Sequence, residues 1–472
     1  MKTKTIIGLE IHVELSTETK MFCSCKNEFG AIPNTNVCPI CLGHPGTLPN
    51  MNKKAVEYAV MAGLAFHCHI RNEQKVDRKK YFYPDLVKGY QLTQFDKPYA
   101  YEGYLELASG KHINIREIHM EEDTGKSNHN EENTALMDYN RAGVPLIEIV
   151  TDPDMNSPEE AREFVETLAS TLKFLGVSDC IMAEGSMRVD VNVNLKDEES
   201  GKRTEIAEIK NINSIKAIEN ALKYEVNRQN ELLKNNEIGI KETRRWDDIE
   251  LKTLHMRNKE VGNDYRFSAD GDIPDIYISD EFIENIKSNL PELPKEKQRR
   301  YIKEYKLSEY DASLLSNDRE LAELFEKTKE IIGDSTLTAN WILTELSRRL
   351  NESEETPSQM KLSIENFAKL IILAKEEKIN NNVAKKLLRE IYTTNEDPEK
   401  LAKDRNLLQI SDESFLEDIV TEVLNENPDS IADIKAGKDR AFGFLVGQAM
   451  KKTKGKGNPQ QINKLLKEKI GE

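Results

Sequence analysis

The sequence of 472 residues contains no run of about 18 apolar residues, so it offers no candidate transmembrane helix. Its first residues, MKTKTIIG, also lack the long apolar stretch and the small-residue cleavage site of a signal peptide. Six cysteines are too few for a disulfide scaffold in a chain of this length, which favours a reducing cytosol. A net charge of −16 excludes a uniformly basic nucleic-acid binder.

Several signatures of nucleotide binding and hydrolysis are missing as well. The chain has neither G-x-x-x-x-G-K-[ST] nor G-x-G-x-x-G, so any nucleotide is held without a Walker loop or a Rossmann turn. It also has no G-x-S-x-G elbow and no glycine- and serine-rich stretch of the amidase type. We therefore do not expect this chain to hydrolyse an amide itself.

What the chain does contain divides it into three regions, as its length also suggests. Residues 1–290 combine strand-like alternation with Gly and Pro turns and a few helical stretches. Residues 295–400 are rich in Lys, Glu, Leu and Ile at helical spacing, and a second helical region covers 405–472. The sequence predicts an α+β body followed by two small helical modules.

Two segments alternate strictly between apolar and polar residues. In residues 7–15 the odd positions are apolar, which places Glu10 and His12 on the same polar face of a strand. Residues 188–195 repeat the pattern, with Asp190 on the polar face. Both segments are predicted to be half-buried strands that carry their functional groups on the unburied side.

One helix can be placed from its ends. Ser157 is the expected N-cap, Pro158 occupies the first turn, and Glu160 completes a capping box. Apolar residues follow at helical spacing until Gly176 ends the helix. We expect this helix to be part of the core scaffold without a role in the chemistry.

Four cysteines form a C-x-C and a C-x-x-C pair with twelve residues between them: Cys23, Cys25, Cys38 and Cys41. Two close pairs joined by a short loop allow four sulfurs to converge on one tetrahedral Zn²⁺. Because four thiolates leave no open coordination position, the zinc is predicted to be structural and to hold the loop of residues 22–45. Free thiols are the alternative. Cys68 and Cys180 have no such partners, and we interpret them as small buried hydrophobic residues.

Carboxylates accompany Glu10 and His12 in three further segments, residues 119–126, 184–190 and 208–213. Each segment alone is weak, since a run of carboxylates is usually a solvated face. Together they supply hard oxygen ligands and one imidazole, a set that suits Mg²⁺ or Mn²⁺ better than Zn²⁺. Such ions commonly bridge protein carboxylates to substrate phosphates.

Cations alternate with aromatic residues in residues 78–90, where we expect Tyr81 and Tyr83 to share a strand face. This composition can hold phosphates and stack a base or a ribose, although an exposed aromatic loop fits it equally well. Residues 441–472 hold seven lysines and two glutamates. This basic patch suits contact with an RNA backbone, with ordinary solvated helix ends as the alternative.

Taken together, these segments resemble the B-subunit family of the tRNA-dependent Asp/Glu amidotransferase, in the family's order and from end to end. The likeness lies in GLEIH (8–12), NTNVCPICLG (34–43), DRKKYFYPD (77–85), EEDTGKS (121–127), NRAGVPLIE (140–148), EGSMR (184–188), EIKNINS (208–214) and AFGFLVGQ (441–448).

The resemblance implies a cradle-shaped catalytic domain over 1–290, a helical domain over 295–400 and a tRNA-binding tail domain over 405–472. It implies a carbon–nitrogen ligase that uses ATP and Mg²⁺ to phosphorylate the side-chain carboxylate of misacylated Glu-tRNA(Gln), Asp-tRNA(Asn) or both. Ammonia that an A subunit releases from glutamine then displaces the phosphate, and a C subunit completes a cytoplasmic heterotrimer. In this mechanism the nucleophile belongs to the substrate, so the protein needs no Ser/His pair.

The resemblance also assigns site residues. The magnesium candidates are Glu10, His12 and Glu122, with Asp190 and Glu208 lining the same pocket. The candidates for phosphate or acyl-end contacts are Lys79, Tyr81, Tyr83, Lys88 and Arg188. Glu122 is preferred to Glu121 by analogy with the family alone, because the alternation pattern in this segment does not decide between them.

Two departures and two alternatives accompany this interpretation. Val189 stands where many relatives have a cysteine, on the core side of its strand, and residues 264–269 lack the family's aromatic-proline ending. A zinc-stabilised tRNA-docking subunit whose partner performs all the chemistry is the second hypothesis, although rows of carboxylates are poorly suited to RNA. An aminoacyl-tRNA synthetase is disfavoured, because its HIGH-like and KMSKS-like motifs are absent.

Overall fold

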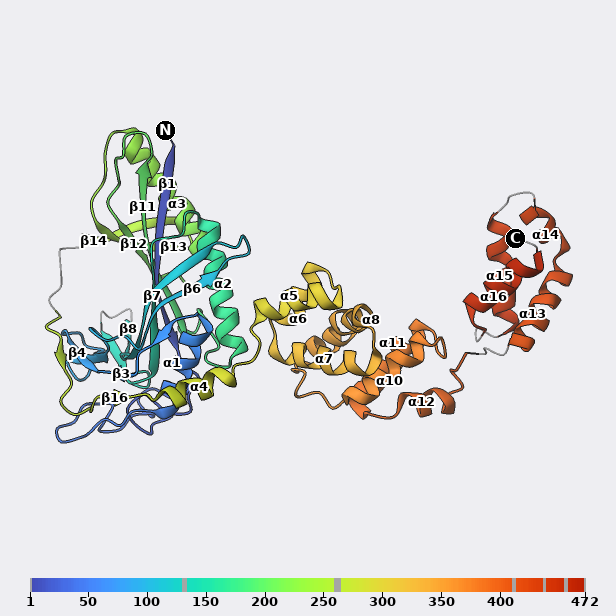
Figure 1. Ribbon diagram of the computed structural model, residues 1–472, viewed down its shortest axis with the longest axis horizontal. Helices are drawn as coiled ribbons and strands as arrows, with labels where there is room; N and C mark the ends of the chain where they lie inside the picture. Colours follow the sequence, from blue (N-terminus) through green and yellow to red (C-terminus); the bar gives the residue numbers. More distant parts are fainter. Residues whose placement is uncertain are drawn as a thin grey trace. The chain divides into compact units, whose positions relative to one another are not determined.

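The computed structural model describes residues 2–129, 134–258, 265–409, 413–435, 439–453 and 457–470. The chain forms two units, Met1–Leu293 and Pro294–Glu472 (Figure 1). The first combines sheets with helices and the second is helical, which confirms the predicted fold class. Asp264, the first residue of the 264–269 segment, and Lys454 and Lys456, two of the seven lysines of residues 441–472, lie outside the described residues.

Nine strands form the main sheet of the first unit. From one edge to the other they are β14 (Lys252–Asn258), β13 (Glu242–Asp247), β12 (Ala207–Lys210), β11 (Met187–Asp197), β1 (Thr3–Glu14), β10 (Pro145–Thr151), β7 (His112–Glu122), β6 (Ala100–Glu106) and β2 (His69–Ile70). All neighbours are antiparallel except β12 and β13, so the sheet is mixed.

Short strands make three smaller sheets beside it. They are β4 (Asp77–Lys80) between β5 (Tyr90–Thr93) and β15 (Ser268–Ala269), then β3 (Glu73–Gln74) with β16 (Ile276–Tyr277), and β8 (Lys126–His129) with β9 (Ala135–Asp138).

The predicted alternation is present in both central strands. In β1 the odd residues from Ile7 to Val13 are buried, whereas Glu10, His12 and Glu14 are only partly covered. The burial of β11 alternates in the same way along its whole length. Since residues directly opposite each other in antiparallel strands share a face, the polar residues of neighbouring strands meet on one side of the sheet.

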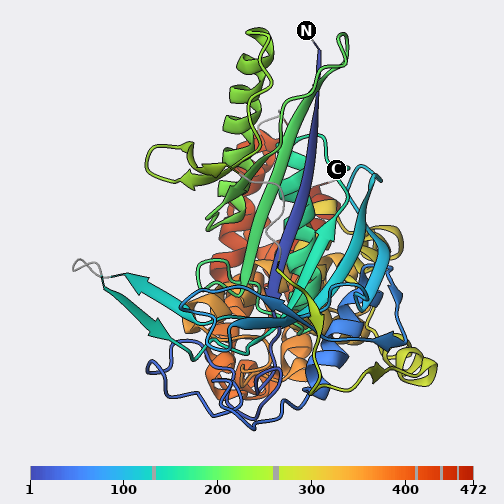
Figure 2. The same ribbon diagram turned by 90° about the vertical axis from the view of Figure 1, so that its left-hand side faces the viewer.

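Three helices lie along the apolar side of the sheet: α1 (Lys53–Ala65), α2 (Pro158–Phe174) and α3 (Ile215–Lys234) (Figure 2). The predicted start of α2 is confirmed, because the Ser157 hydroxyl accepts a hydrogen bond from the Glu160 backbone N–H at 3.1 Å. The predicted capping box requires a hydrogen bond from the Ser157 backbone N–H to the Glu160 carboxylate. That carboxylate instead accepts a hydrogen bond from the Asn156 backbone N–H at 2.7 Å. Gly176 follows the helix with a φ of +69°, as its role at the helix end requires. A fourth helix, α4 (Asp280–Ser288), precedes the end of the unit.

The second unit contains helices alone among its described residues. They are α5 (Pro294–Tyr305), α6 (Glu309–Ser316), α7 (Arg319–Ile332), α8 (Ser335–Asn340), the π-helical turn η1 (Trp341–Leu346), α9 (Ser347–Ser353), α10 (Ile364–Lys375), α11 (Asn381–Thr394), α12 (Pro398–Asp404), α13 (Glu413–Glu426), α14 (Pro428–Lys435), α15 (Asp439–Lys452) and α16 (Pro459–Ile470).

Buried side chains in this unit form two clusters, one from Tyr301 to Ala402 and the other from Leu416 to Ile470. No described helix of the chain is both long enough and apolar enough to cross a bilayer.

Candidate active site and metal sites

The polar face of the main sheet brings Glu10, His12 and Glu148 together. His12 of β1 lies directly opposite Glu148 of β10, and Glu10 is two residues away on the same face. One ligand atom from each of the three side chains lies within 4.8 Å of the others, a spacing that fits one metal ion. Two carboxylates and an imidazole suit Mg²⁺ or Mn²⁺.

Glu121 of β7 borders this group. Its carboxylate lies 3.9 Å from His12 Nε2, the same distance at which Glu148 approaches that nitrogen from β10. The Thr93 hydroxyl and the Gln91 side-chain amide donate hydrogen bonds to Glu121, the latter at 3.1 Å, so its orientation is fixed. The cluster therefore holds three carboxylates around one histidine.

Crowding of these carboxylates alters their protonation. Burial, the charge of Glu121 and a hydrogen bond to Glu10 raise the pKa of Glu148 well above its usual value. For Glu10, burial alone would raise the pKa, but the hydrogen bond with Glu148 and the charges of His12 and Lys210 bring it below the usual value. Opposite shifts of this kind are expected of two neighbouring carboxyl groups joined by a hydrogen bond.

Glu122 does not join Glu10 and His12, contrary to the magnesium set predicted from the sequence. Consecutive residues of a strand point to opposite faces, so Glu121 faces the cluster and Glu122 faces away from it. The Glu122 carboxylate accepts hydrogen bonds from Lys88 Nζ and, at 3.0 Å, from the Leu92 N–H.

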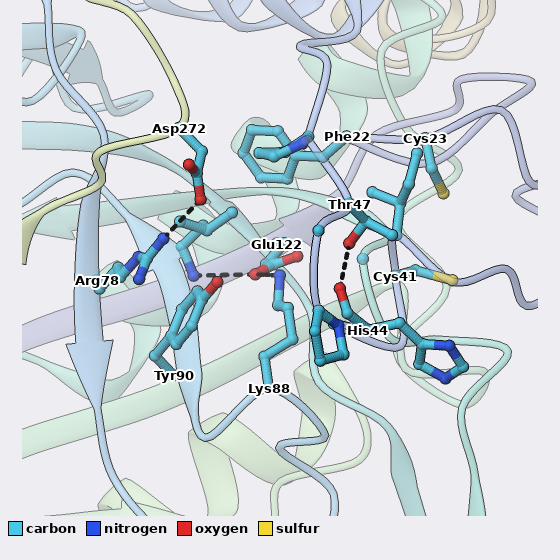
Figure 3. A pocket seen from close by; sticks show the side chains of 17 residues that line it. Phe22, Cys23, Cys41, His44, Thr47, Arg78, Lys88, Tyr90, Glu122 and Asp272 are labelled. Carbon is cyan, nitrogen blue, oxygen red and sulfur yellow. Dashed lines mark hydrogen bonds and ion pairs between the residues drawn. The ribbon is translucent and has the colours of Figure 1, made fainter.

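Glu122 and Lys88 line a separate cavity of about 220 Å³ (Figure 3). Tyr90 lies beside them, with the Lys88 ammonium 5.4 Å from the centre of its ring. Arg78 lies over the same ring, 4.4 Å from its centre, and pairs with Asp272 at 3.0 Å. The predicted phosphate contact Lys88 is thus engaged with the Glu122 carboxylate, outside the group of Glu10, His12 and Glu148.

The predicted residues Asp190 and Glu208 extend the polar face across the next two strands. Asp190 lies directly opposite Glu10, and Glu208 of β12 lies opposite Asn192. Lys210 forms ion pairs with both carboxylates, at 3.5 Å for Glu208. Burial raises the pKa of Asp190, although the Lys210 charge opposes this. Lys210 was not among the predicted site residues.

Arg188, another predicted contact, is held by a buried acid. Its guanidinium lies 2.6 Å from Asp123, and Arg141 approaches the same carboxylate at 3.4 Å. Burial would raise the pKa of Asp123, but the two arginines bring it below its usual value. A cavity of about 510 Å³ opens beside this group, and its charged lining consists of four cations and five carboxylates: Lys126, Arg141, Arg188, Lys210, Glu14, Glu28, Asp138, Glu184 and Asp190. The lining thus offers cations for an anionic group and carboxylates for a cation.

Glu14 is the acidic neighbour of Asp123, and its replacement is expected to stabilise the protein at high pH. Burial and the Asp123 charge raise the pKa of Glu14 from 4.5 to about 8. Because the folded state holds this proton more tightly than the unfolded state, Glu14 lowers the stability progressively as the pH rises from about 4.5 to about 8.

We therefore expect Glu14→Gln to unfold at the same urea concentration as the wild type near pH 5 and at a higher one at pH 8.5. The exposed Glu18→Gln variant is the control and should match the wild type at both values. A Glu14→Gln protein that is less stable than the wild type at pH 8.5 would contradict this interpretation.

The structure corrects the strand predicted for Tyr81 and Tyr83. Strand β4 ends at Lys80, and both tyrosines follow it in a loop. Pairing with β5 stops at Tyr90, and Pro84 cannot donate a ladder hydrogen bond, so the strand does not continue. The two rings nevertheless meet edge to face, with centroids 6.5 Å apart.

Tyr81 begins a chain of aromatic contacts. The centroid of its ring lies 5.9 Å from that of Tyr265. The Tyr265 ring lies 6.0 Å from the Phe267 ring, and the Phe267 ring stacks on Phe95 with centroids 4.0 Å apart. The Lys79 ammonium lies 5.1 Å from the centre of the Tyr265 ring. Burial and the charges of Asp85, Glu121 and Asp123 raise the pKa of Tyr81, so this ring adjoins the carboxylates.

The four cysteines of the predicted quartet converge as their spacing implies. One sulfur from each of Cys23, Cys25, Cys38 and Cys41 lies within 4.8 Å of the other three. A hydrogen bond from Cys23, aided by the Cys38 backbone and the Lys20 charge, lowers the pKa of Cys41 to about 4 against the effect of burial. Four sulfurs at this spacing fit a tetrahedral Zn²⁺. Cys68 and Cys180 are buried away from the quartet, as expected of small hydrophobic residues.

Comparison with known proteins identifies the family. Residues 5–284 match the model of the GatB/GatE catalytic domain, and residues 323–470 match that of the GatB domain. The chain belongs to the GatB family. Relatives named as the B subunit of aspartyl/glutamyl-tRNA(Asn/Gln) amidotransferase align over the full length of this chain. The protein of Finegoldia magna is 60% identical over all of both chains, and that of Caldicellulosiruptor saccharolyticus is 47% identical over 99% of its own length.

Two residues of this GatB-family site, Glu148 and Lys210, were not predicted from the sequence. Glu148 is the single charged residue of the apolar strand β10. Because a charge in such a segment is costly to bury without a partner, it could have been recognised as a candidate functional residue. Lys210 follows Glu208 at the strand spacing of two residues, so a shared face could have been inferred. Both were present in segments that carry the resemblance, but neither was assigned a role.

Proposed function

We propose that this chain is the kinase and transamidase subunit of a glutamine-dependent tRNA amidotransferase. It would phosphorylate the side-chain carboxylate of Glu-tRNA(Gln), Asp-tRNA(Asn) or both with ATP, and then transfer ammonia to the activated carbonyl. The observation that carries the proposal is the cluster of Glu10, His12 and Glu148 in a GatB-family chain, beside a cavity that Asp190, Arg188 and Lys210 line.

The reaction makes modest demands on the protein. The substrate carboxylate is already ionised at neutral pH, so no residue has to remove a proton before it attacks the terminal phosphorus of ATP. ADP leaves as the new carboxyl–phosphate bond forms. Ammonia then adds to the acyl carbon and expels phosphate, which is a far better leaving group than oxide. The protein has to align two anions and stabilise the transferred group.

The cluster supplies the metal-binding part of this task. Glu10, His12 and Glu148 would hold Mg²⁺, which when bound neutralises charge on the phosphates. Glu121, fixed by Thr93 and Gln91, would orient water or His12 beside it. The donor set of this chain fits a hard divalent cation, because oxygen ligands predominate.

Cations on the same face would hold the anions in place. The charge of Lys79 opposes the rise in the pKa of Glu148. Lys210 forms ion pairs with both Asp190 and Glu208. Arg188 is oriented by Asp123 toward the cavity of about 510 Å³. We assign the ATP phosphates and the acyl end of the tRNA to these residues, whereas Lys88 borders the other cavity.

The aromatic chain from Tyr81 to Phe95 suits the single-stranded end of the tRNA. Unpaired bases stack on aromatic side chains, and stacking is tolerant of base identity. Phe95 and Tyr83 are more than half exposed, so their rings are accessible. Tyr81 adjoins the carboxylate cluster, and the chain could therefore guide the acylated 3′ nucleotide toward it.

The remaining parts of the proposal concern partners and the structural metal. Since the chain has no amidase signature, ammonia has to come from an A subunit with glutaminase activity, and a C subunit would complete a cytoplasmic heterotrimer. The cysteine quartet would hold a structural Zn²⁺. We assign residues 1–290, 295–400 and 405–472 to the catalytic, helical and tRNA-binding domains.

The test is the detection of the amidated product. The purified chain is combined with its A and C partners, ATP, Mg²⁺, glutamine and one misacylated tRNA at a time. After nuclease digestion, thin-layer chromatography or mass spectrometry should reveal glutaminyl-adenosine, asparaginyl-adenosine or both. If neither forms, and if the partners alone use ATP, the docking-subunit hypothesis is favoured instead.

Deletion of residues 405–472 is expected to raise the KM for tRNA about tenfold or more while the complex keeps its glutaminase activity. The reason is the loss of a basic helical module that contacts the RNA backbone. Lys452 and Lys469 pair with acidic residues of α13 at 2.7 Å, so only part of the local charge is available to phosphates. Steady-state kinetics at two salt concentrations measure the effect. An unchanged KM would exclude the tail from tRNA binding.

A further inference from the structure

Lys20 is a lysine whose side chain is completely buried, with an exposed fraction of 0%. Its ammonium donates hydrogen bonds to the Tyr139 carbonyl oxygen at 3.3 Å and to Cys41 Sγ at 3.7 Å. Among the described residues, no Asp or Glu forms an ion pair with it. A buried ammonium without an anionic partner is strongly unfavourable, so the position calls for negative charge nearby.

The cysteine quartet is the group that can supply this charge. A Zn²⁺ bound by four thiolates carries a net charge of −2, which an adjacent buried ammonium would neutralise in part. We propose that Lys20 is the charge partner of a metal–tetrathiolate centre and slows the release of its metal. The inference rests on the zinc site proposed above, but assigns a role to a residue outside the ligand set.

The backbone around Lys20 explains how its side chain is directed inward. The Lys20 N–H donates to the Cys25 carbonyl at 3.0 Å, and the Asn52 side-chain amide donates to the Lys20 carbonyl at 3.2 Å. These bonds attach Lys20 to the cysteine loop on one side and to the cap of α1 on the other. With the backbone held in this way, the buried side chain reaches Cys41 Sγ and the Tyr139 carbonyl oxygen.

The same residue joins the quartet to the segment of residues 139–143. Besides the bond from Lys20 to the Tyr139 carbonyl, the N–H of Met21 donates to the Gly143 carbonyl at 2.8 Å. The Gly143 N–H in turn donates to the Asp123 carbonyl at 2.9 Å. Gly143 itself has a φ of +89°, and a Cβ there would contact Lys20 Cδ at 3.5 Å. Lys20 therefore acts as a positioning residue between the metal centre and the region of Asp123.

The first experiment measures metal release from the zinc-loaded full-length chain. A chromophoric chelator in excess reports the rate for the wild type, Lys20→Met and Lys20→Gln. Loss of a partner outside the ligand set typically weakens metal binding by about 10- to 100-fold, and we expect release to accelerate by a similar factor. The Gln variant keeps a polar group for the Tyr139 carbonyl, so acceleration in both variants identifies the charge as the cause. Lys26→Met, an exposed lysine of the same loop, should release zinc at the wild-type rate.

The second experiment compares melting temperatures with and without metal. In the zinc-free protein the charge opposite Lys20 is smaller than in the tetrathiolate, so we expect Lys20→Met to lower the melting temperature less there than in the zinc-loaded protein. Zinc should then raise the melting temperature less in Lys20→Met than in the wild type. A residue with a merely structural role would shift both forms equally.

The outcomes distinguish a failure of the role proposed for Lys20 from a failure of the zinc site on which that role depends. Equal release rates and equal zinc-induced shifts in wild type and Lys20 variants would overturn the role of Lys20. A wild-type chain that contains no zinc after purification, and that shows no thiolate-to-metal absorption band with Co²⁺, would overturn the zinc site itself. A changed Co²⁺ band in Lys20→Met, with four sulfur ligands retained, would support the proposal.

Discussion

Glu148→Gln and His12→Ala are each expected to lower the kcat for tRNA-dependent amidation by at least about 100-fold. The reason is that Glu148, His12 and Glu10 together form the proposed magnesium site, and metal-ion catalysis is worth several kcal/mol in transition-state stabilisation. Binding of the misacylated tRNA should change little, because the proposed RNA contacts, the aromatic side chains and the basic tail, lie outside the cluster. Single-turnover assays of the acyl phosphate, with hydroxylamine as the trap, measure the step directly.

Glu117→Gln is the matched control for these variants. Glu117 belongs to β7 as Glu121 does, but it pairs with His119 at 3.4 Å and does not belong to the Glu10, His12 and Glu148 group. It should retain activity within a few-fold of the wild type. If Glu148→Gln is fully active and Glu122→Gln is inactive, the magnesium set that contains Glu122 is correct. The set that contains Glu148 is then wrong.

Asp123→Asn is expected to have the largest effect on stability. Asp123 is buried and pairs with Arg188 at 2.6 Å and Arg141 at 3.4 Å. Removal of one partner from a buried ion pair costs about 3–5 kcal/mol, because the remaining charges are left unpaired. Urea unfolding of the first unit, followed by tryptophan fluorescence, measures the loss.

The comparison for this variant is Asp152→Asn, which removes a partner of Arg116 at a partly exposed position. Exposed ion pairs contribute about 1 kcal/mol or less, so this change should be nearly silent. If the two substitutions have equal effects, Asp123 is not the buried centre that its contacts suggest.

The sequence predicted the parts of the site that rest on periodicity and spacing. The strict alternation of residues 7–15 and 188–195 placed Glu10, His12 and Asp190 on polar strand faces, and the structure has them there. The spacing of the cysteines likewise predicted their convergence. These features are local, so a single sequence contains the whole signal.

Other features depend on contacts between distant segments and could not be predicted. Two consecutive glutamates gave no basis for deciding whether Glu121 or Glu122 faces His12, because the answer depends on the register of β7 against β10. Tyr81 and Tyr83 looked strand-like, but Pro84 and the end of pairing at Lys80 stop the strand. Lys20 was assigned no role, because its burial depends on contact with the segment of residues 139–143.

The two consecutive glutamates of β7 have a mechanical consequence. Glu121 approaches His12 from one face of the strand, whereas Glu122 lines the cavity of about 220 Å³ on the other face. The backbone between these two residues therefore separates the carboxylate cluster from that cavity, so a change in the register of β7 would alter both surroundings at once.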